Sequence, residues 1–382
     1  MTFRIRYAGL ATAAALSLSP GIAQAESLTY AIGYAPGSNP VVAAESLVEY
    51  SKANGGPDIQ IFPMSLLNIK ETPPGIRDHA VDMGFNAHAL FLAEYPNSNL
   101  PAEFGVFATD ATAGDNVFWG PAAMAGAITE YIMLHCPECV SEFAADNQVY
   151  LSGQASAAYA LHCTQDVTTL AQIKGKQIRT PSGYWSKWVE AMGAVSVFMS
   201  ANEAFSAMSQ GVVDCVVFQP SELITVRLID VVKSTTLGVP QGLFSGASVV
   251  NINRDAWRGL NAANRKVLLE ASARMNAQMT WLVSAQTTEA LEEEAKRGIP
   301  VHEAGADLQQ ATTEFVSHLR DNVIKEYTAN YQLADIDAKV DTIQSLIDKW
   351  VGLTKDAKTA DDLFQLYLTE IYSKVDPETY GL

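Results

Sequence analysis

The stretch from Gly175 to Pro220 decides the fold, and it reads GKQIRTPSGYWSKWVEAMGAVSVFMSANEAFSAMSQGVVDCVVFQP. Its apolar and β-branched runs predict three strands, which cover residues 176–180, 195–199 and 212–218. A helix is expected between the first two strands, because apolar residues recur there at the spacing of one helix face. A second helix begins at the S-x-x-E capping box of Ser200 and Glu203 and ends at Gly211.

Strands that alternate with short helices indicate an α/β fold with parallel pairing, in which ligands bind at the carboxyl ends of the strands. Arg179 lies at such an end. Its planar guanidinium can hold a carboxylate through two parallel hydrogen bonds, and a helix that starts near Gly183 would add amide donors. The stretch therefore predicts an anion-binding site. The alternative is an internal ion pair between Arg179 and an acid such as Glu203.

At these residues the chain resembles the substrate-binding proteins of TRAP transporters, the tripartite ATP-independent periplasmic importers of organic acids. The motifs that carry the resemblance are GKQIRTP, MGAVSV and NEAFSAMSQGVVD, and a weaker match runs from Leu28 to Val301. The resemblance implies the DctP-type fold, which is a two-lobed periplasmic binding protein of the type II kind with a long helix spanning both lobes. It also implies that Arg179 grips the carboxylate of the substrate.

The expected division of the chain has a signal peptide and two lobes. Residues 1–25 are the signal peptide, residues 26–154 and 243–280 form lobe I, and residues 155–242 and 281–382 form lobe II with a C-terminal helical extension. One amphipathic helix is predicted over residues 262–297, and at about 1.5 Å per residue it would extend roughly 50 Å, farther than one lobe. A pair of shorter helices is the alternative, because no Pro or Gly in that range decides between them.

The first 25 residues have the pattern of a secretory signal peptide. Two arginines precede an apolar run over residues 8–18, and an A-x-A cleavage site at residues 23–25 precedes Glu26. The run is shorter than the roughly 18 to 20 residues of a membrane span, which disfavours an anchor. The mature protein is therefore expected in the periplasm, without direct insertion into the membrane.

The chain of 382 residues is acidic, with a formal net charge of -17 at pH 7. Without residues 1–25 it keeps 23 basic and 42 acidic residues, which is a net charge of -19. Such a surface argues against nucleic acid and anionic membranes as partners, because phosphates bind to basic patches. An anionic ligand would need a locally positive pocket.

Four cysteines in an oxidising compartment are expected to pair, and three connectivities are possible. We favour Cys136 with Cys139, and Cys163 with Cys215. A redox C-x-x-C is the functional alternative, but the strand and aromatic neighbour typical of thioredoxins are missing. A zinc site is disfavoured because no second C-x-x-C exists and only two histidines lie close in sequence. Neither a metal nor a cofactor is expected.

Further residues are candidates for the ligand site beside Arg179. Residues 81–86 repeat the helix-to-strand plan of residues 213–219, so two similar lobes would place Asn86 and Gln219 at corresponding strand ends; chance similarity is the alternative. In much of the resembled family a second arginine precedes the first, but Tyr159 stands in that region here. The other candidates are Tyr184 and Trp185 in an aromatic wall with Tyr159, Phe218 beside Gln219, and His88 near Asn86. Core packing is the alternative for each of these rings.

The leading hypothesis is an extracytoplasmic binding protein that closes two lobes on a small organic acid and delivers it to a TRAP membrane permease, as a monomer or dimer. It requires no catalysis. A periplasmic hydrolase is a second hypothesis, but the chain has neither G-x-S-x-G nor H-E-x-x-H, and its six histidines are scattered. A periplasmic sensor subunit that binds the same ligand is a third hypothesis, which the sequence separates poorly from the first.

Overall fold

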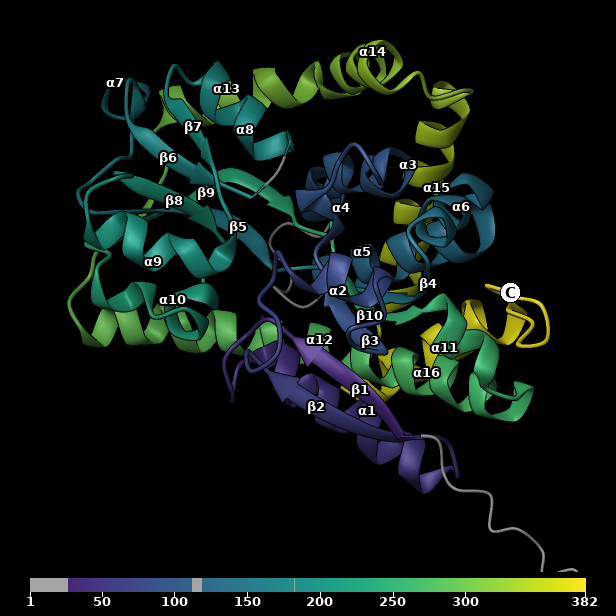
Figure 1. The fold of residues 1–382 in the computed structure, drawn as a ribbon. Helices are drawn as coiled ribbons and strands as arrows, with labels where there is room; N and C mark the ends of the chain where they lie inside the picture. Colours follow the sequence, from purple (N-terminus) through teal and green to yellow (C-terminus); the bar gives the residue numbers. More distant parts are fainter. Residues whose placement is uncertain (1–26, 112–118, 182) are drawn as a thin grey trace, which may run out of the picture.

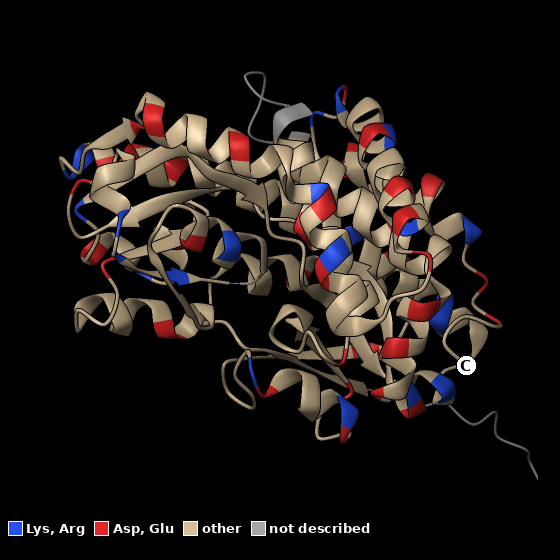
Figure 2. Cartoon of the chain, turned by 90° about the horizontal axis from the view of Figure 1, so that it is seen from above, with Lys and Arg blue, Asp and Glu red and all other residues tan. Residues whose placement is uncertain are grey.

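The computed structural model describes residues 27–111, 119–181 and 183–382, which form an α/β protein with two sheets (Figure 1). The predicted signal peptide lies outside the described residues. Acidic residues occur on helices of both lobes, with fewer basic residues among them (Figure 2).

The first sheet has five strands in the order β2-β1-β3-β10-β4. Their bounds are β1 Ser27–Ile32, β2 Asp58–Pro63, β3 Met83–Asn86, β4 Gln148–Gly153 and β10 Ser248–Asn253. β1 pairs in parallel with β2 and β3, whereas β10 runs antiparallel to β3 and β4. Helices α1 (Asn39–Ala53) and α2 (Thr72–Arg77) connect the parallel strands.

The second sheet has six strands in the order β11-β9-β5-β8-β6-β7. Their bounds are β5 Ala158–Cys163, β6 Gln177–Thr180, β7 Val195–Phe198, β8 Cys215–Phe218, β9 Ser234–Leu243 and β11 Val301–Glu303. β6 pairs in parallel with β7 and β8, whereas β5 runs antiparallel to β8 and β9. Apart from β11, this arrangement repeats that of the first sheet. The two lobes are therefore built alike, as the repeated helix-to-strand pattern predicts.

Residues 175–220 fold as predicted, with α8 (Gly183–Ala191) and α9 (Ala201–Ser209) between the strands. The capping box is present, because Glu203 Oε2 accepts hydrogen bonds from the Ser200 N–H at 2.9 Å and from Ser200 Oγ at 2.7 Å. β8 begins at Cys215 rather than at Val212. The reason is that the chain first closes the end of α9: Gly211 has φ of +68°, and the Val212 N–H donates back to Ala207 O.

Before the C-terminal helices, three segments cross between the lobes. Residues 154–157 join β4 to β5, and residues 244–247 join β9 to β10. These two crossings lie side by side, because Ser156 and Phe244 exchange two hydrogen bonds of 2.8 Å through their N–H groups. The third is α12 (Ala262–Lys296), a single helix of 35 residues, as predicted. It packs on α1 and β10 of lobe I and on β11 of lobe II.

The C-terminal helices differ from the expectation that they extend lobe II. α13 (Ala306–Ser317) packs on α8 and β9 of lobe II, and α14 (Leu319–Tyr331) then leads the chain across to α15 (Figure 1). α15 (Ile336–Thr354) packs on α5 (Trp119–Glu130), and α16 (Ala360–Glu370) packs on α12. The Trp350 ring of α15 packs directly against Gly126 of α5. A Cβ at position 126 would lie within 2.4 Å of this ring, so the contact requires glycine.

The remaining helices are short. They are α3 Pro96–Asn99, α4 Gly105–Ala111, α6 Pro137–Ala145, α7 Leu170–Ile173, α10 Glu222–Thr225 and α11 Arg254–Gly259. Among the residues described, no helix combines the length and apolar character needed to cross a membrane.

Both favoured disulfides are present. Cys163 and Cys215 are directly opposed on the antiparallel strands β5 and β8, and their bond ties these strands together. Cys136 and Cys139 are bonded at the start of α6, where Cys136 Sγ also accepts a hydrogen bond from the Cys139 N–H. Within the described ranges, His, Cys, Asp and Glu side chains form no group of three or more that could hold a metal ion.

Candidate functional site

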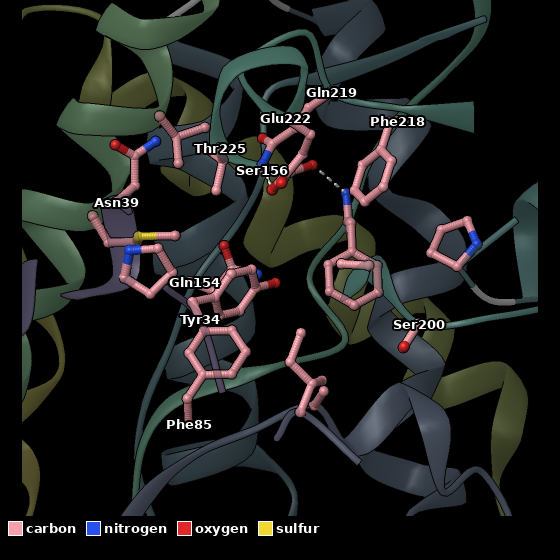
Figure 3. Close-up of a pocket in the computed structure, with 18 of the residues that line it drawn as sticks. Tyr34, Asn39, Phe85, Gln154, Ser156, Ser200, Phe218, Gln219, Glu222 and Thr225 are labelled. Carbon is pink, nitrogen blue, oxygen red and sulfur yellow. Dashed lines mark hydrogen bonds between the residues drawn. The ribbon is translucent and has the colours of Figure 1, made fainter. Parts of the chain in front are cut away.

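A cavity lies between the lobes, beside the three crossing segments (Figure 3). About 680 Å³ of space between the lining residues is free of protein atoms, and this value includes space that is open to solvent. Lobe I contributes Tyr34, Asn39 and Phe85, the crossings contribute Gln154, Ser156, Phe244, Met279 and Val283, and lobe II contributes Tyr159, Arg179, Phe218, Gln219, Glu222 and Thr225.

Arg179 is the cationic residue of this lining, and its side chain is held in place by backbone. Only 2% of the residue is exposed. Nε donates to Met199 O and Nη1 donates to Val217 O, each at 3.1 Å, and the guanidinium carbon lies 4.1 Å from the centre of the Phe218 ring. These contacts fix the plane of the fork and leave Nη2 without a hydrogen bond to any described residue. Burial lowers the pKa of Arg179, whereas Tyr159 and Glu222 raise it.

The alternative role of Arg179, an ion pair with Glu203, is not observed. Glu203 binds Lys70 Nζ at 2.8 Å as well as capping α9. No described carboxylate forms an ion pair with Arg179, so the buried cation lacks a full counter-charge in contact. A buried charge without a partner is costly, and such a charge in a cavity is typical of a site whose ligand supplies the opposite charge.

Gln219 and Glu222 form a buried hydrogen-bonded pair at the carboxyl end of β8 (Figure 3). Gln219 Nε2 donates to Glu222 Oε1 at 3.0 Å, and 6% of each residue is exposed. Burial raises the pKa of the Glu222 carboxyl to about 7, while Gln219 and Arg179 act to lower it. The second oxygen, Oε2, is buried and has no hydrogen-bond partner among the described residues.

Aromatic rings form the apolar walls of the cavity. Tyr159 lies between Phe218, with ring centres 5.9 Å apart, and Phe244, with ring centres 6.4 Å apart. On the facing lobe, Tyr34 contacts Phe85 edge to face at 5.4 Å. The site thus combines one cation, one acid and several apolar faces, which suits a small organic anion with an apolar part.

Four of the eight predicted site residues line this cavity: Arg179, Gln219, Tyr159 and Phe218. The other four lie outside its lining. Tyr184 and Trp185 anchor α8 to β9, since the Tyr184 hydroxyl donates to Pro240 O at 2.9 Å and the Trp185 indole N–H donates to Gln241 O at 3.0 Å. Trp185 stacks on the Tyr159 ring with centres 4.6 Å apart, so it supports a lining residue.

Asn86 and His88 point into the interior of lobe I. Asn86 Nδ2 donates to Gln148 Oε1 at 2.9 Å. His88 packs against Tyr95 and Phe143, with ring centres 6.0 and 5.8 Å away, and burial lowers its pKa to about 3. The correspondence of Asn86 and Gln219 therefore holds for their positions in the two sheets, but the two side chains have different surroundings.

Glu222 and Tyr34 are the main lining residues that the sequence reasoning missed. Tyr34 follows β1, and the rule that ligands bind at carboxyl strand ends could have found it. Glu222 begins the short helix α10 beyond Pro220, and no sequence pattern marks it as buried.

A polar bridge at the edge of the cavity joins the lobes to α12. Gln286 Oε1 accepts a hydrogen bond from Asn39 Nδ2 at 2.7 Å and another from Thr225 Oγ1 at 2.9 Å. Asn39 belongs to α1 of lobe I and Thr225 to α10 of lobe II, and both residues line the cavity. Gln286 thus contacts both sides of the cleft at once.

Two sheets of equal plan, segments that cross between the lobes and a cavity in the cleft are the architecture of a two-lobed binding protein. The family model of the DctP proteins, described as bacterial extracellular solute-binding protein, family 7, matches residues 44–326, well over half of the chain. The chain belongs to this family, which confirms the resemblance drawn from the arginine motif. The family is one of extracytoplasmic binding proteins of TRAP transporters rather than of enzymes.

Solved structures share the fold at low sequence identity. A TRAP solute-binding protein from Rhodoferax ferrireducens, in complex with copurified benzoate, matches with a TM-score of 0.72 and 18% identity over 86% of this chain and 99% of that one. A Bordetella bronchiseptica TRAP solute-binding protein with bound mandelate matches with a TM-score of 0.70 and 21% identity, over 85% of this chain and 99% of that one. A marine metagenome TRAP solute-binding protein specific for pyroglutamate matches with a TM-score of 0.69 and 17% identity, over 85% of this chain and 99% of that one.

Proposed function

We propose that this protein binds a small organic acid between its lobes, with Arg179 holding the carboxylate, and delivers the acid to the membrane permease of a TRAP transporter. Residues 1–25 direct export to the periplasm and are removed before Glu26. The protein changes nothing in the ligand chemically. The lobe boundaries follow the crossings at residues 154–157 and 244–247.

The buried Arg179 carries this proposal. Its guanidinium is fixed by two backbone carbonyls, lines the cavity and has no ion-pair partner among the described residues. A carboxylate from the ligand would supply the missing charge and could accept two hydrogen bonds from the planar fork. Benzoate, mandelate and pyroglutamate, which occupy the similar structures, are small acids that each carry one carboxylate.

Substitution of Arg179 tests the proposal. Arg179→Ala should weaken binding of the best acid from a thermal-shift screen by roughly 30-fold to several thousand-fold, because removing one partner of a buried charge pair costs roughly 2 to 5 kcal/mol. Arg179→Lys should also bind weakly, since it keeps the charge but loses the fork. Calorimetric titration measures both affinities, and circular dichroism checks that both variants fold.

Arg265→Lys is the matched control, because Arg265 is also buried, with 7% exposed, but lies on α12 outside the cavity lining. Its affinity should equal that of the wild type. If folded Arg179 variants bind within about threefold of the wild type, Arg179 does not hold the ligand.

A further inference from the structure

The orientation of the Gln219 amide is fixed by the backbone. The Ala157 N–H donates to Gln219 Oε1 at 2.9 Å, so the carbonyl oxygen of this side chain faces the crossing segment. Its Nε2 must then face Glu222, and the 3.0 Å contact to Glu222 Oε1 is a hydrogen bond donated by the amide. One oxygen of Glu222 is thereby occupied and held in a single direction.

The other oxygen, Glu222 Oε2, has no donor among the described residues, although only 6% of the residue is exposed and it lines the cavity. A buried acceptor without a donor is costly, and native proteins rarely keep one without a purpose. Arg179 does not satisfy it, because no ion pair joins the two residues, although each influences the charge of the other. The missing donor is therefore to be sought in the ligand.

We propose that the ligand is an organic acid that also carries a hydrogen-bond donor, an N–H or O–H group, which Glu222 Oε2 accepts while Arg179 holds the carboxylate. This inference rests on the proposed function and adds its substrate class: hydroxy, amino or amido acids rather than plain carboxylic acids. Arg179 binds the carboxylate of the ligand and Glu222 binds its donor. Because both side chains are fixed, they determine the orientation of the ligand and the distance between its carboxylate and its donor.

A site with a fixed acceptor discriminates strongly against analogues that lack the donor, because the acceptor then stays unpaired. Hydrogen bonds to charged groups are worth roughly 1.5 to 3 kcal/mol, so the donor should raise affinity by about 10- to 150-fold. Two matched pairs of acids isolate this effect. Pyroglutamate has an amide N–H that cyclopentanecarboxylate lacks, and mandelate has an O–H that phenylacetate lacks.

The experiment is calorimetric titration of the wild type, Glu222→Gln and Glu294→Gln with all four acids. Glu222→Gln keeps the shape, and its carbonyl oxygen still accepts from Gln219, so its amide nitrogen replaces Oε2 and offers a donor instead of an acceptor. Glu294 is the matched control: it is fully buried, its Oε2 also lacks a described partner, and it lies outside the cavity lining.

In the wild type and Glu294→Gln, the donor-bearing acid of at least one pair should bind at least about tenfold more tightly than its match. Glu222→Gln should reduce this ratio to within about threefold while its melting temperature stays close to the wild-type value. Acids that bind without donor preference, or a preference that survives in Glu222→Gln, would overturn this inference alone. If the folded wild type binds neither these acids nor any of a wider panel of small carboxylates, the proposed function fails as well.

Discussion

Burial raises the pKa of the Glu222 carboxyl to about 7, which is close to neutral pH. The Gln219 amide and the Arg179 guanidinium act to lower this pKa, and burial together with the Glu222 carboxylate raises the pKa values of the nearby Tyr34 and Tyr159 hydroxyls. Above this pKa both oxygens of Glu222 are acceptors. Below it, the carboxyl carries a proton and Oε2 becomes a donor.

Ligand affinity should therefore depend on pH differently for the two kinds of acid. The affinity for a donor-bearing acid relative to its match should rise between about pH 6 and pH 8, as Glu222 loses its proton. Acids without a donor should bind more tightly at the lower pH, because the negative charge near their carboxylate is then absent. Titration calorimetry across this range measures both trends.

Glu222→Gln cannot ionise, so its affinities should stay flat between the same pH values. A wild-type profile that is equally flat would show that Glu222 does not titrate there.

Sequence reasoning found residues whose role follows from position along a strand, and missed residues whose role follows from closure of the lobes. Arg179 and Gln219 stand at strand ends, where ligands of parallel sheets bind. Glu222 has an ordinary surface-type side chain in a four-residue helix, and its burial depends on contacts that come from distant segments. The helical spacing of the apolar residues around Trp185 indicates a buried helix face. It does not distinguish a ring that lines the cavity from one that packs behind the lining.

At the scale of elements, the two disulfides differ in the length of chain that they close. Cys163 and Cys215 are separated by 52 positions and join β5 to β8, whereas Cys136 and Cys139 are separated by three. In the chain-entropy model these loops correspond to about 4 and about 1.6 kcal/mol of stabilisation. All four side chains are buried, so the packing cost of replacing either pair is similar.

Cys163→Ala with Cys215→Ala should therefore lower the free energy of unfolding by about 2.5 kcal/mol more than Cys136→Ala with Cys139→Ala. Urea unfolding followed by circular dichroism measures both losses against the oxidised wild type. Adding reductant to the wild type should reproduce the combined loss. Equal losses for the two double variants would contradict the loop-length argument.

Elements with strong local signals were predictable from the sequence. The capping box of Ser200 and Glu203 places the start of α9, and the uninterrupted apolar face of residues 262–297 gives α12 as one helix. The packing partners of the C-terminal helices were not predictable. An apolar face such as that of α15 indicates that the helix is buried on that side, but it does not identify the element against which the helix packs. The small residue that receives Trp350, Gly126, lies more than two hundred positions earlier.

At the scale of the whole molecule, Gln286 couples the two lobes, since Asn39 and Thr225 both donate to its Oε1. Opening the cleft by rotation of one lobe would separate these two donors, and hinge motion of this kind is the usual response of two-lobed binding proteins to ligand. The bridge therefore favours the arrangement in which both lobes contact the ligand.

Gln286→Leu should weaken ligand binding by about 5- to 150-fold, because two donors lose their acceptor at a cost of roughly 1 to 3 kcal/mol. Small-angle scattering should show a larger radius of gyration than the wild type at the same subsaturating ligand concentration. Gln278→Leu, on the same helix but not part of the bridge, is the control. Unchanged affinity in Gln286→Leu would mean that the bridge persists in the open arrangement or does not hold the lobes together.

The contrast between the acidic exterior and the buried Arg179 has a consequence for the speed of encounter. With a formal net charge of -17, the long-range field of the chain repels an anion until it is within reach of the cleft. Dissolved salt screens this field over a Debye length of about 10 Å at 0.1 M, but it screens the buried guanidinium much less. An organic acid should therefore arrive faster in saline water than in fresh water, whereas most electrostatically guided associations slow down as salt is added.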